Sequence, residues 1–169
     1  TITDETREIL GVECFVVRDT VFIDEEIVED TRDWYAVDVE GNVWYFGEIT
    51  LNFEDGELVD IEGSWEAGEE GAKPGVVMFA DPQVGHVYRQ EFLLGEAEDV
   101  GEIHGVDESI NVEIGSFTDC ILKHEYTPID PELVELPELK YYAPGVGFVL
   151  EFNMHSGETI ELVEVIAPE

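Results

Sequence analysis

Turn-forming residues recur at short, regular intervals along this chain, and their spacing restricts its fold more than any other feature. Runs rich in β-branched and aromatic residues lie between the turns, and such residues favour strands. Short strands separated by regular turns are typical of an antiparallel sandwich or barrel. The turns fall at Asp24-Glu25-Glu26, Glu40-Gly41-Asn42, Glu54-Asp55-Gly56, Asp107-Glu108-Ser109 and His155-Ser156-Gly157.

The runs between these turns predict ten strands. Apolar and polar residues alternate in 84–94 and in 117–127, with the period of two that a half-buried strand needs. In 117–127 this pattern places Leu122 on the inner face and Glu125 on the outer face. Residues 66–83 contain repeated Gly and Pro and predict a loop. The predicted strands are 9–22, 27–39, 43–53, 57–65, 84–94, 100–106, 110–114, 117–127, 138–152 and 159–166.

We therefore expect a single all-β domain over residues 1–169, formed as an antiparallel β-barrel or a strongly curved half-barrel of about ten strands, with little helix. A chain of 169 residues is long enough to bury a core. No apolar run approaches the roughly 18 residues of a membrane span, so we expect no span. The chain begins at Thr1, and the sequence leaves open whether a signal peptide or a lipid anchor lies upstream.

The charge of the chain is extreme, with 42 acidic residues against 7 basic ones and a formal net charge of -35. Three interpretations compete: halophilic adaptation to high salt, binding of cations or of a cationic partner, and mimicry of nucleic acid that blocks a DNA-binding protein. Solubility alone is the fourth. Direct binding of nucleic acid is excluded, because no basic patch is present to neutralise phosphates.

The two cysteines, Cys14 and Cys120, both fall in predicted strands. Alternation places Cys14 on one face with Val16, and Cys120 on one face with Leu122, so both thiols are expected to point inward. We predict a disulfide between them, which closes a loop of about 107 residues and contributes roughly 4–5 kcal/mol in the chain-entropy treatment. Two separate buried thiols are the alternative.

Five stretches of the sequence are distinctive. They are DWYAVDVEGNVWYFGE (33–48), GSWEAGEEGAKPGVVM (63–78), YRQEFLLGEAEDVGEI (88–103), V-x-x-G-x-F-x-x-C (112–120) and YYAPGVGFVLEF (141–152). Together they resemble an uncharacterised family of exported bacterial and archaeal β-proteins, and the order of the last two is similar to periplasmic, lipoprotein-carrier-like half-barrels. The resemblance implies export to the periplasm, the cell surface or the exterior, and a curved sheet around an apolar cavity.

Aromatic residues from consecutive predicted strands are the candidates to line such a pocket, namely Trp34, Trp44, Phe46 and Trp65. Ordinary core packing is the alternative. Arg89, one of four arginines, is the candidate anchor for an anionic group of a ligand inside the barrel. An ion pair with one of the many carboxylates is the alternative for Arg89.

Four closely spaced carboxylates form the candidate metal site. They are Glu96, Glu98, Asp99 and Glu102. Because Ca²⁺ takes six to eight oxygen ligands, it is the one cofactor that the sequence suggests, and a solvated acidic loop is the alternative. No zinc-ligand spacing, nucleophile elbow, phosphate-binding loop or dinucleotide fingerprint is found, so no catalytic residue is assigned.

The combined observations favour an exported, monomeric, non-catalytic binding protein that holds a small apolar or amphipathic ligand in a β-barrel cavity. The alternative is a surface protein that binds divalent cations of the Ca²⁺ type. A hydrolase is the third hypothesis, and it requires a convergent polar cluster within the cavity.

The excess of carboxylates predicts that the chain is more stable at high ionic strength. Salt screens the repulsion between carboxylates, and this repulsion is stronger in the compact state than in the expanded one. We expect the melting temperature to rise between low salt and molar KCl. A melting temperature that is unchanged or lower in KCl would contradict the prediction.

Overall fold

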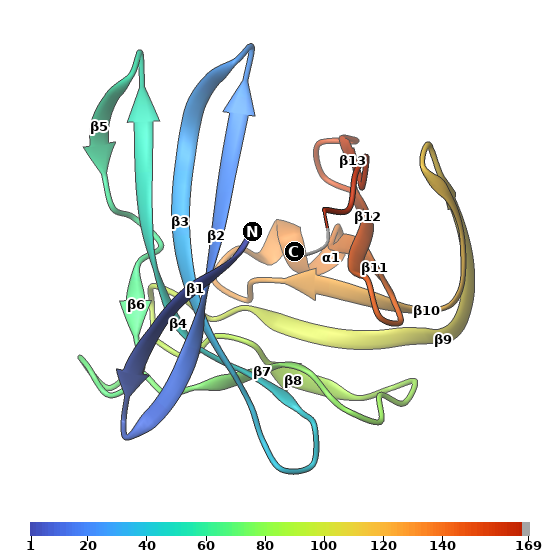
Figure 1. Cartoon of the computed structure of the whole chain (residues 1–169), viewed down its shortest axis with the longest axis horizontal. Helices are drawn as coiled ribbons and strands as arrows, with labels where there is room; N and C mark the ends of the chain where they lie inside the picture. The colour runs from blue at the N-terminus through green and yellow to red at the C-terminus, as the bar shows by residue number, and fades with distance from the viewer. Residues whose placement is uncertain (167–169) are drawn as a thin grey trace. The chain divides into compact units, whose positions relative to one another are not determined.

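The computed structural model describes residues 1–166, and its secondary structure is almost entirely β (Figure 1). Strands make up 60% and helix 3%, and the strands form two antiparallel sheets of seven and six. The predicted all-β, antiparallel fold class is therefore confirmed. Within residues 1–166 neither sheet closes into a barrel, which agrees with the half-barrel rather than the barrel of the two expected architectures.

The chain divides into two compact units, which are described separately. The first comprises Thr1–Ala80 and Arg89–Glu98, and the second comprises Asp81–Tyr88 and Asp99–Glu169. The seven-stranded sheet belongs to the first unit and most of the six-stranded sheet to the second. A single domain over the whole chain stays a prediction. Over residues 1–166 we find no helix with the length and apolar character needed to cross a membrane.

The sheet of the first unit has its main strands paired in chain order from β1 to β5, while β6 and β7 pair with β4. Its strands are β1 (Ile2–Ile9), β2 (Val12–Ile23), β3 (Glu26–Val37), β4 (Val43–Glu54), β5 (Glu57–Asp60), β6 (Trp65–Glu66) and β7 (Gly75–Met78). Residues 66–83, expected as a loop, therefore contain β7 and the end of β6. The short β5 pairs only with the last residues of β4, which leaves the rest of that strand edge for these two segments.

Two-residue turns join three of the four hairpins formed by β1 to β5, and residues 38–42 join β3 to β4. Both residues of each turn have positive φ, as the type I′ turn that matches strand twist requires. The turns are Leu10-Gly11, Asp24-Glu25 and Asp55-Gly56. The first of them lies inside the predicted strand 9–22, which corresponds to β2, and β1 before this turn was not predicted. Sequence reasoning missed this turn because a branched apolar residue such as Leu10, here with φ of 52°, rarely adopts this conformation.

A β-bulge in β4 changes which of its side chains share a face. Gly47 pairs with Trp34 and Tyr45 pairs with Tyr35, so one residue of β4 is extra. In a regular strand Tyr45 and Glu48, three residues apart, would lie on opposite faces. The bulge places both on the same face, which no alternation pattern predicts.

The core of the first unit is built around aromatic side chains. The ring of Tyr45 stacks on Tyr35, with 4.7 Å between centroids, and meets Trp65 edge-on at 5.3 Å. The buried members of this core are Ile9, Cys14, Val16, Trp34, Ala36, Tyr45, Phe46, Trp65, Ala67, Ala72 and Ala97.

The second unit contains the six-stranded sheet, with the order β13-β12-β11-β10-β9-β8, and one short helix. Its elements are β8 (Val87–Arg89), β9 (Val100–Val112), β10 (Gly115–Tyr126), α1 (Pro131–Glu135), β11 (Glu138–Ala143), β12 (Gly147–Asn153) and β13 (Thr159–Glu161). The helix begins after Asp130, whose side chain accepts a hydrogen bond from the backbone N–H of Glu132.

Several predicted boundaries in this unit are wrong. No turn forms at 107–109, because β9 runs on without a break and Glu108 pairs there with Cys120 of β10. The predicted strand 138–152 is a hairpin of β11 and β12, and only β8 forms within 84–94.

Over residues 122–125 of β10 both faces of the strand are covered, contrary to the predicted outer position of Glu125. Glu125 is 8% exposed and Lys123 is fully buried, while Leu122 and His124 on the other face are half-buried. The prediction for Glu125 is wrong because lysine ammonium groups, rather than water, satisfy its charge.

Both cysteines are buried, as expected, but both are free thiols. Cys14 lies in the core of the first unit, whereas Cys120 packs in the second unit with Ala143 and Val149. The predicted disulfide is therefore wrong, since each thiol is enclosed by its own sheet. Burial raises the pKa of the Cys14 thiol to about 11 and also raises that of Cys120. The cysteines thus give no support to an oxidising compartment.

The bulge in β4 predicts that Gly47 tolerates no side chain. Its φ is 128°, and an added Cβ would lie 2.2 Å from the carbonyl oxygen of Trp65 on β6. We expect Gly47→Ala to lower the free energy of unfolding by about 3–5 kcal/mol, through backbone strain and displacement of β6. Urea denaturation in molar KCl measures this loss.

Gly56→Ala is the matched control, because Gly56 also has positive φ, of 77°, but has open space around its Cβ position. It should cost about 1–2 kcal/mol, the strain of a left-handed conformation alone. Equal losses for the two variants would show that contact with β6 is unimportant.

Candidate functional site

The four aromatic residues predicted to line a pocket lie in the first unit, in or against its core. Trp34, Phe46 and Trp65 are 5%, 6% and 4% exposed. Trp44 packs against this core and donates its indole N–H to a carboxylate oxygen of Asp38, at 2.9 Å. Core packing therefore accounts for all four, and Trp34 in addition borders a groove described below.

Arg89 lies against an acidic neighbour, as the alternative for this residue states. Its guanidinium donates to a carboxylate oxygen of Glu98 at 2.8 Å and lies over the ring of Phe92, 5.3 Å from the centroid. Arg89 is therefore held by the protein itself and is not the expected anchor for a ligand.

Two of the four predicted metal ligands have other partners. Glu98 accepts a hydrogen bond from the guanidinium of Arg89 at 2.8 Å. Glu102 pairs with His104, at 3.2 Å between carboxylate oxygen and Nε2. Among residues 1–166 no group of three or more His, Cys, Asp or Glu side chains is arranged to hold a metal ion. A Ca²⁺ site at these four residues therefore gains no support and stays a prediction.

The placement of the seven basic side chains is informative because they are so few. Six make close contacts with named partners: Arg7 with Glu66, Arg18 with Asp30, Lys73 with Phe92, Arg89 with Glu98, and Lys123 and Lys140 with Glu125. The seventh is Arg32, which is exposed. In the described part of the chain Arg32 forms no ion pair and no ring contact, and its charge acts at longer range on Asp30.

The two lysines of the second unit are buried around one carboxylate. The ammonium groups of Lys123 and Lys140 lie 2.5 Å and 2.8 Å from the two carboxylate oxygens of Glu125. The hydroxyl of Tyr142 donates to the same group at 3.0 Å. Burial alone would raise the pKa of Glu125, but the two ammonium groups hold it well below its ordinary value. This network stabilises the sheet and leaves neither lysine free for a ligand.

A second buried polar network lies in the first unit and contains no basic residue. The hydroxyl oxygen of Tyr45 is 2.7 Å from a carboxylate oxygen of Asp33 and 2.7 Å from one of Glu48. A tyrosine hydroxyl has one proton, so it donates to one carboxyl group and accepts from the other, which must then be protonated. Burial raises the pKa of both acids, that of Glu48 to about 8. These three groups therefore share protons in place of a cation.

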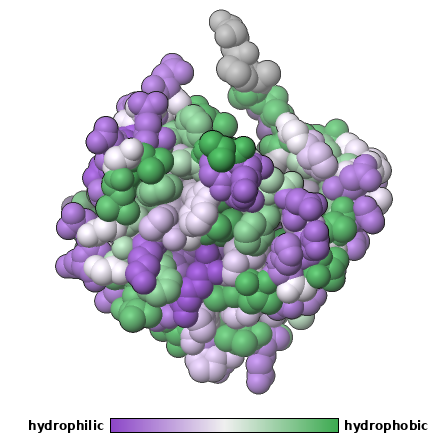
Figure 2. Space-filling model, turned by 90° about the horizontal axis from the view of Figure 1, so that it is seen from below, coloured by the Kyte–Doolittle hydropathy of each residue, from purple (hydrophilic) through white to green (hydrophobic). Residues whose placement is uncertain are grey.

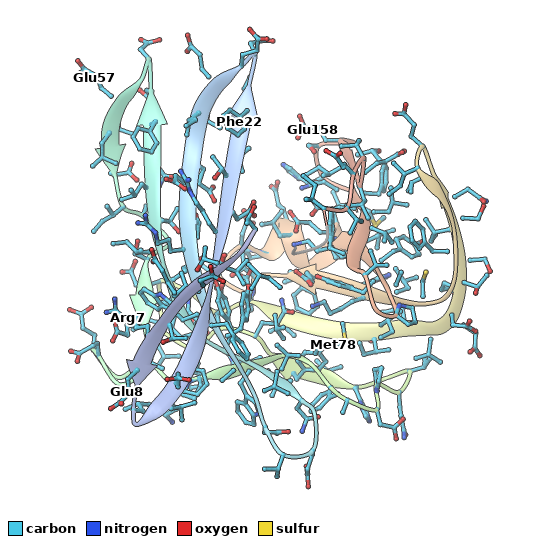
Figure 3. The ribbon with its side chains drawn as sticks, viewed as in Figure 1. Arg7, Glu8, Phe22, Glu57, Met78 and Glu158 are labelled. Atoms are coloured by element: carbon cyan, nitrogen blue, oxygen red, sulfur yellow. The ribbon has the colours of Figure 1, made fainter. Side chains whose placement is uncertain are left out.

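A groove of about 330 Å³ lies on one face of the sheet of the first unit. Its floor is apolar and crosses three strands, because Val16 pairs with Trp34 and Arg32 pairs with Ile49 in the strand register. Arg7, which Figure 3 labels on β1, lies at its border. The lining residues are Glu5, Thr6, Arg7, Val16, Arg32, Trp34 and Ile49.

The two arginines of the groove differ in their partners. The guanidinium carbon of Arg7 lies 4.2 Å from the ring centroid of Trp34, and its Nη2 bonds to Glu66 at 2.5 Å. Arg32 pairs in register with Arg18, and the hydrogen bonds of Arg18 to Asp30 neutralise Arg18. Arg32 therefore presents an uncompensated guanidinium, with five N–H donors, beside an apolar floor.

Sequence reasoning did not single out Arg7 or Arg32. Arg32 precedes Trp34 by two residues, which places both on one face of a strand. That spacing, together with the scarcity of arginine, was the available signal. The sequence does not give the strand register, and it is this register that brings Arg18 close enough to bond to Asp30.

No family model, curated protein or solved structure matches this chain. The resemblance to exported half-barrel proteins therefore stays a prediction, and the site is interpreted from its own geometry.

The proton-sharing network predicts a pH dependence of stability that depends on Glu48. The pKa of this group rises from 4.5 to about 8 on folding, so between these values the folded chain holds a proton that the unfolded chain releases. The contribution of Glu48 to the free energy of unfolding is therefore highest below pH 4.5 and is lost as the pH rises toward 8. We expect the unfolding free energy of wild type, minus that of Glu48→Gln, to fall by about 2–4 kcal/mol between pH 5 and pH 8.

Urea denaturation across this range in molar KCl gives the measurement. Glu57→Gln, which removes an exposed carboxylate on β5, is the control and should leave the pH profile of wild type unchanged. If Glu48→Gln follows the wild-type profile as well, Glu48 is ionised in the folded state at pH 5 and the shared proton does not exist.

Proposed function

We propose that this chain is a non-catalytic binding protein that holds a small amphipathic anion in the groove between Arg7 and Arg32. The observation that carries the proposal is the uncompensated guanidinium of Arg32 beside the apolar floor formed by Trp34, Val16 and Ile49. In a chain with 42 acidic residues, an arginine without an acidic partner is the exception that needs an explanation.

The dimensions and chemistry of the groove support a small ligand. Ligand pockets are typically about 300–1,000 Å³, mostly apolar, with few polar groups that fix orientation. The groove has about 330 Å³ and follows this pattern. The planar guanidinium fork of Arg32 matches a carboxylate or a similar planar anionic group, with two parallel hydrogen bonds. An apolar body of about eight carbon atoms would cover the floor.

The net charge of -35 opposes the approach of an anion at low salt. In 1 M salt the screening length falls to ~3 Å, so only charges in contact with the ligand affect its binding. Glu5 is the one carboxylate among the residues that line the groove. Arg7 is paired with Glu66, so among these lining residues the guanidinium of Arg32 is the cation without an ion-pair partner. We expect its donor fork to select an anion, under the salt conditions that are predicted to stabilise the chain.

This proposal keeps the amphipathic ligand expected from the sequence but moves it from a barrel interior to an open groove. Export, a monomeric state and the salt-adapted character of the chain stay predictions beside it.

The proposal is tested with three probes that share an eight-carbon chain and differ in charge: octanoate, octanol and octylammonium. Calorimetric titration in 1 M KCl measures each affinity. We expect octanoate to bind about tenfold more tightly than octanol, corresponding to one charge-assisted hydrogen-bonded pair. Arg32→Gln should abolish this difference while binding of octanol is retained.

Arg89→Gln is the matched control, because it removes the same charge from a guanidinium that lies outside the groove and is paired with Glu98. It should leave the preference for octanoate within about twofold of wild type. If octylammonium binds most tightly, or if both variants lose the preference equally, the groove is not an anion site.

A further inference from the structure

Large apolar side chains are exposed at the free ends of two adjacent hairpins in the first unit. On the face shown in Figure 2, apolar and polar residues are interspersed, which is usual for a protein surface. At the ends of β2–β3 and β4–β5 they are concentrated instead, and Figure 3 labels Phe22 and Glu57 there. Seven large apolar residues in this region have between 38% and 62% of their surface exposed, namely Val21, Phe22, Ile23, Ile27, Leu58, Val59 and Ile61.

A second groove, of about 340 Å³, lies between these two hairpins. Ile27 and Phe53 provide apolar surface, and the Asp55-Gly56 turn closes one side. Glu26 and Asp30 contribute carboxylates from β3. The groove therefore combines apolar walls with acidic borders, unlike the Arg32 groove.

The charges around this groove are unbalanced. Asp30 bonds to Arg18, but Glu26 and Asp55 form no ion pair among the described residues. Exposed apolar residues that gather beside a groove with a polar border are typical of an interaction site. We infer that the groove between the β2–β3 and β4–β5 hairpins docks a basic, amphipathic polypeptide segment, in which Lys or Arg residues alternate with apolar ones.

Charge complementarity favours a basic amphipathic segment over the two other possible occupants, a second copy of the chain and a bare cation. A second copy of the chain would bring another net charge of -35 against the same surface, which is unfavourable. A bare cation would need closely converging oxygen ligands and would gain nothing from Ile27 and Phe53. A basic amphipathic segment instead buries its apolar side chains in the groove and pairs its cations with Glu26 and Asp55.

This inference is independent of the anion site, since the two grooves have no lining residue in common. It concerns a macromolecular partner, whereas the Arg32 groove concerns a small ligand. Failure of either proposal therefore leaves the other standing.

The test uses two synthetic peptides of alternating sequence, one of lysine and valine and one of glutamate and valine, each with blocked ends. Binding is measured by calorimetry with the full chain in 1 M KCl, where the screening length of ~3 Å removes the effect of distant carboxylates. We expect the lysine peptide to bind and the glutamate peptide not to bind. Ile27→Ser should weaken binding of the lysine peptide at least about fivefold.

Two matched controls locate the effect. Ile160→Ser changes an exposed isoleucine of β13 in the second unit and should leave affinity within about twofold. Glu26→Gln with Asp55→Asn should weaken binding about tenfold, whereas Asp4→Asn with Glu8→Gln, the same charge change on β1, should not.

Equal losses for both carboxylate pairs would show that only diffuse charge attracts the peptide and would overturn the proposal, as would no binding at all. A concentration-dependent dimer in sedimentation, lost in Ile27→Ser, would identify a second copy as the occupant and would also overturn it.

Discussion

The buried contact of Glu125 with Lys123 and Lys140 is the interaction on which the sheet of the second unit depends. Lys123 and Lys140 lie directly opposite each other in the register of β10 and β11. Two like charges in that position are unfavourable, and the carboxylate of Glu125, which contacts both ammonium groups, offsets their repulsion. Loss of one partner from such a buried group costs about 3–5 kcal/mol. Because a slip of β11 by one residue would turn Lys140 to the face opposite Glu125, the network also favours the observed strand register.

The first unit buries acid groups by a different route, because none of the five basic residues described in it bonds to Asp33 or Glu48. Asp33 and Glu48 both contact the hydroxyl of Tyr45. Their pKa values are raised, so a bound proton removes the negative charge that ammonium groups balance at Glu125. The shortage of basic residues thus has two structural consequences. Lys123 and Lys140 are placed beside the buried Glu125, where an unpaired carboxylate would be costly. At Asp33 and Glu48, burial instead raises the carboxyl pKa values.

The sequence predicted the features that depend on local pattern. Turn spacing indicated an antiparallel all-β fold, and alternation placed Cys14 and Cys120 inside. What failed depended on pairing between distant strands: the bulge that puts Tyr45 and Glu48 on one face, and the lysines that let Glu125 turn inward. The candidate site failed for the same reason. The sequence does not distinguish Arg89 from Arg32 as a ligand anchor. The fold does, because it pairs Arg89 with Glu98 and leaves Arg32 without an ion pair among the described residues.

Strand β1 has a consequence for behaviour at high protein concentration. It forms one edge of its sheet, is eight residues long, and carries Asp4, Glu5, Arg7 and Glu8 exposed. Concentrated salt screens long-range repulsion and strengthens apolar association, the conditions under which open sheet edges join into fibres. Charges on the edge itself still act, because a strand added to β1 from a second copy would place carboxylates about 5 Å apart. The edge therefore resists aggregation where net charge no longer can.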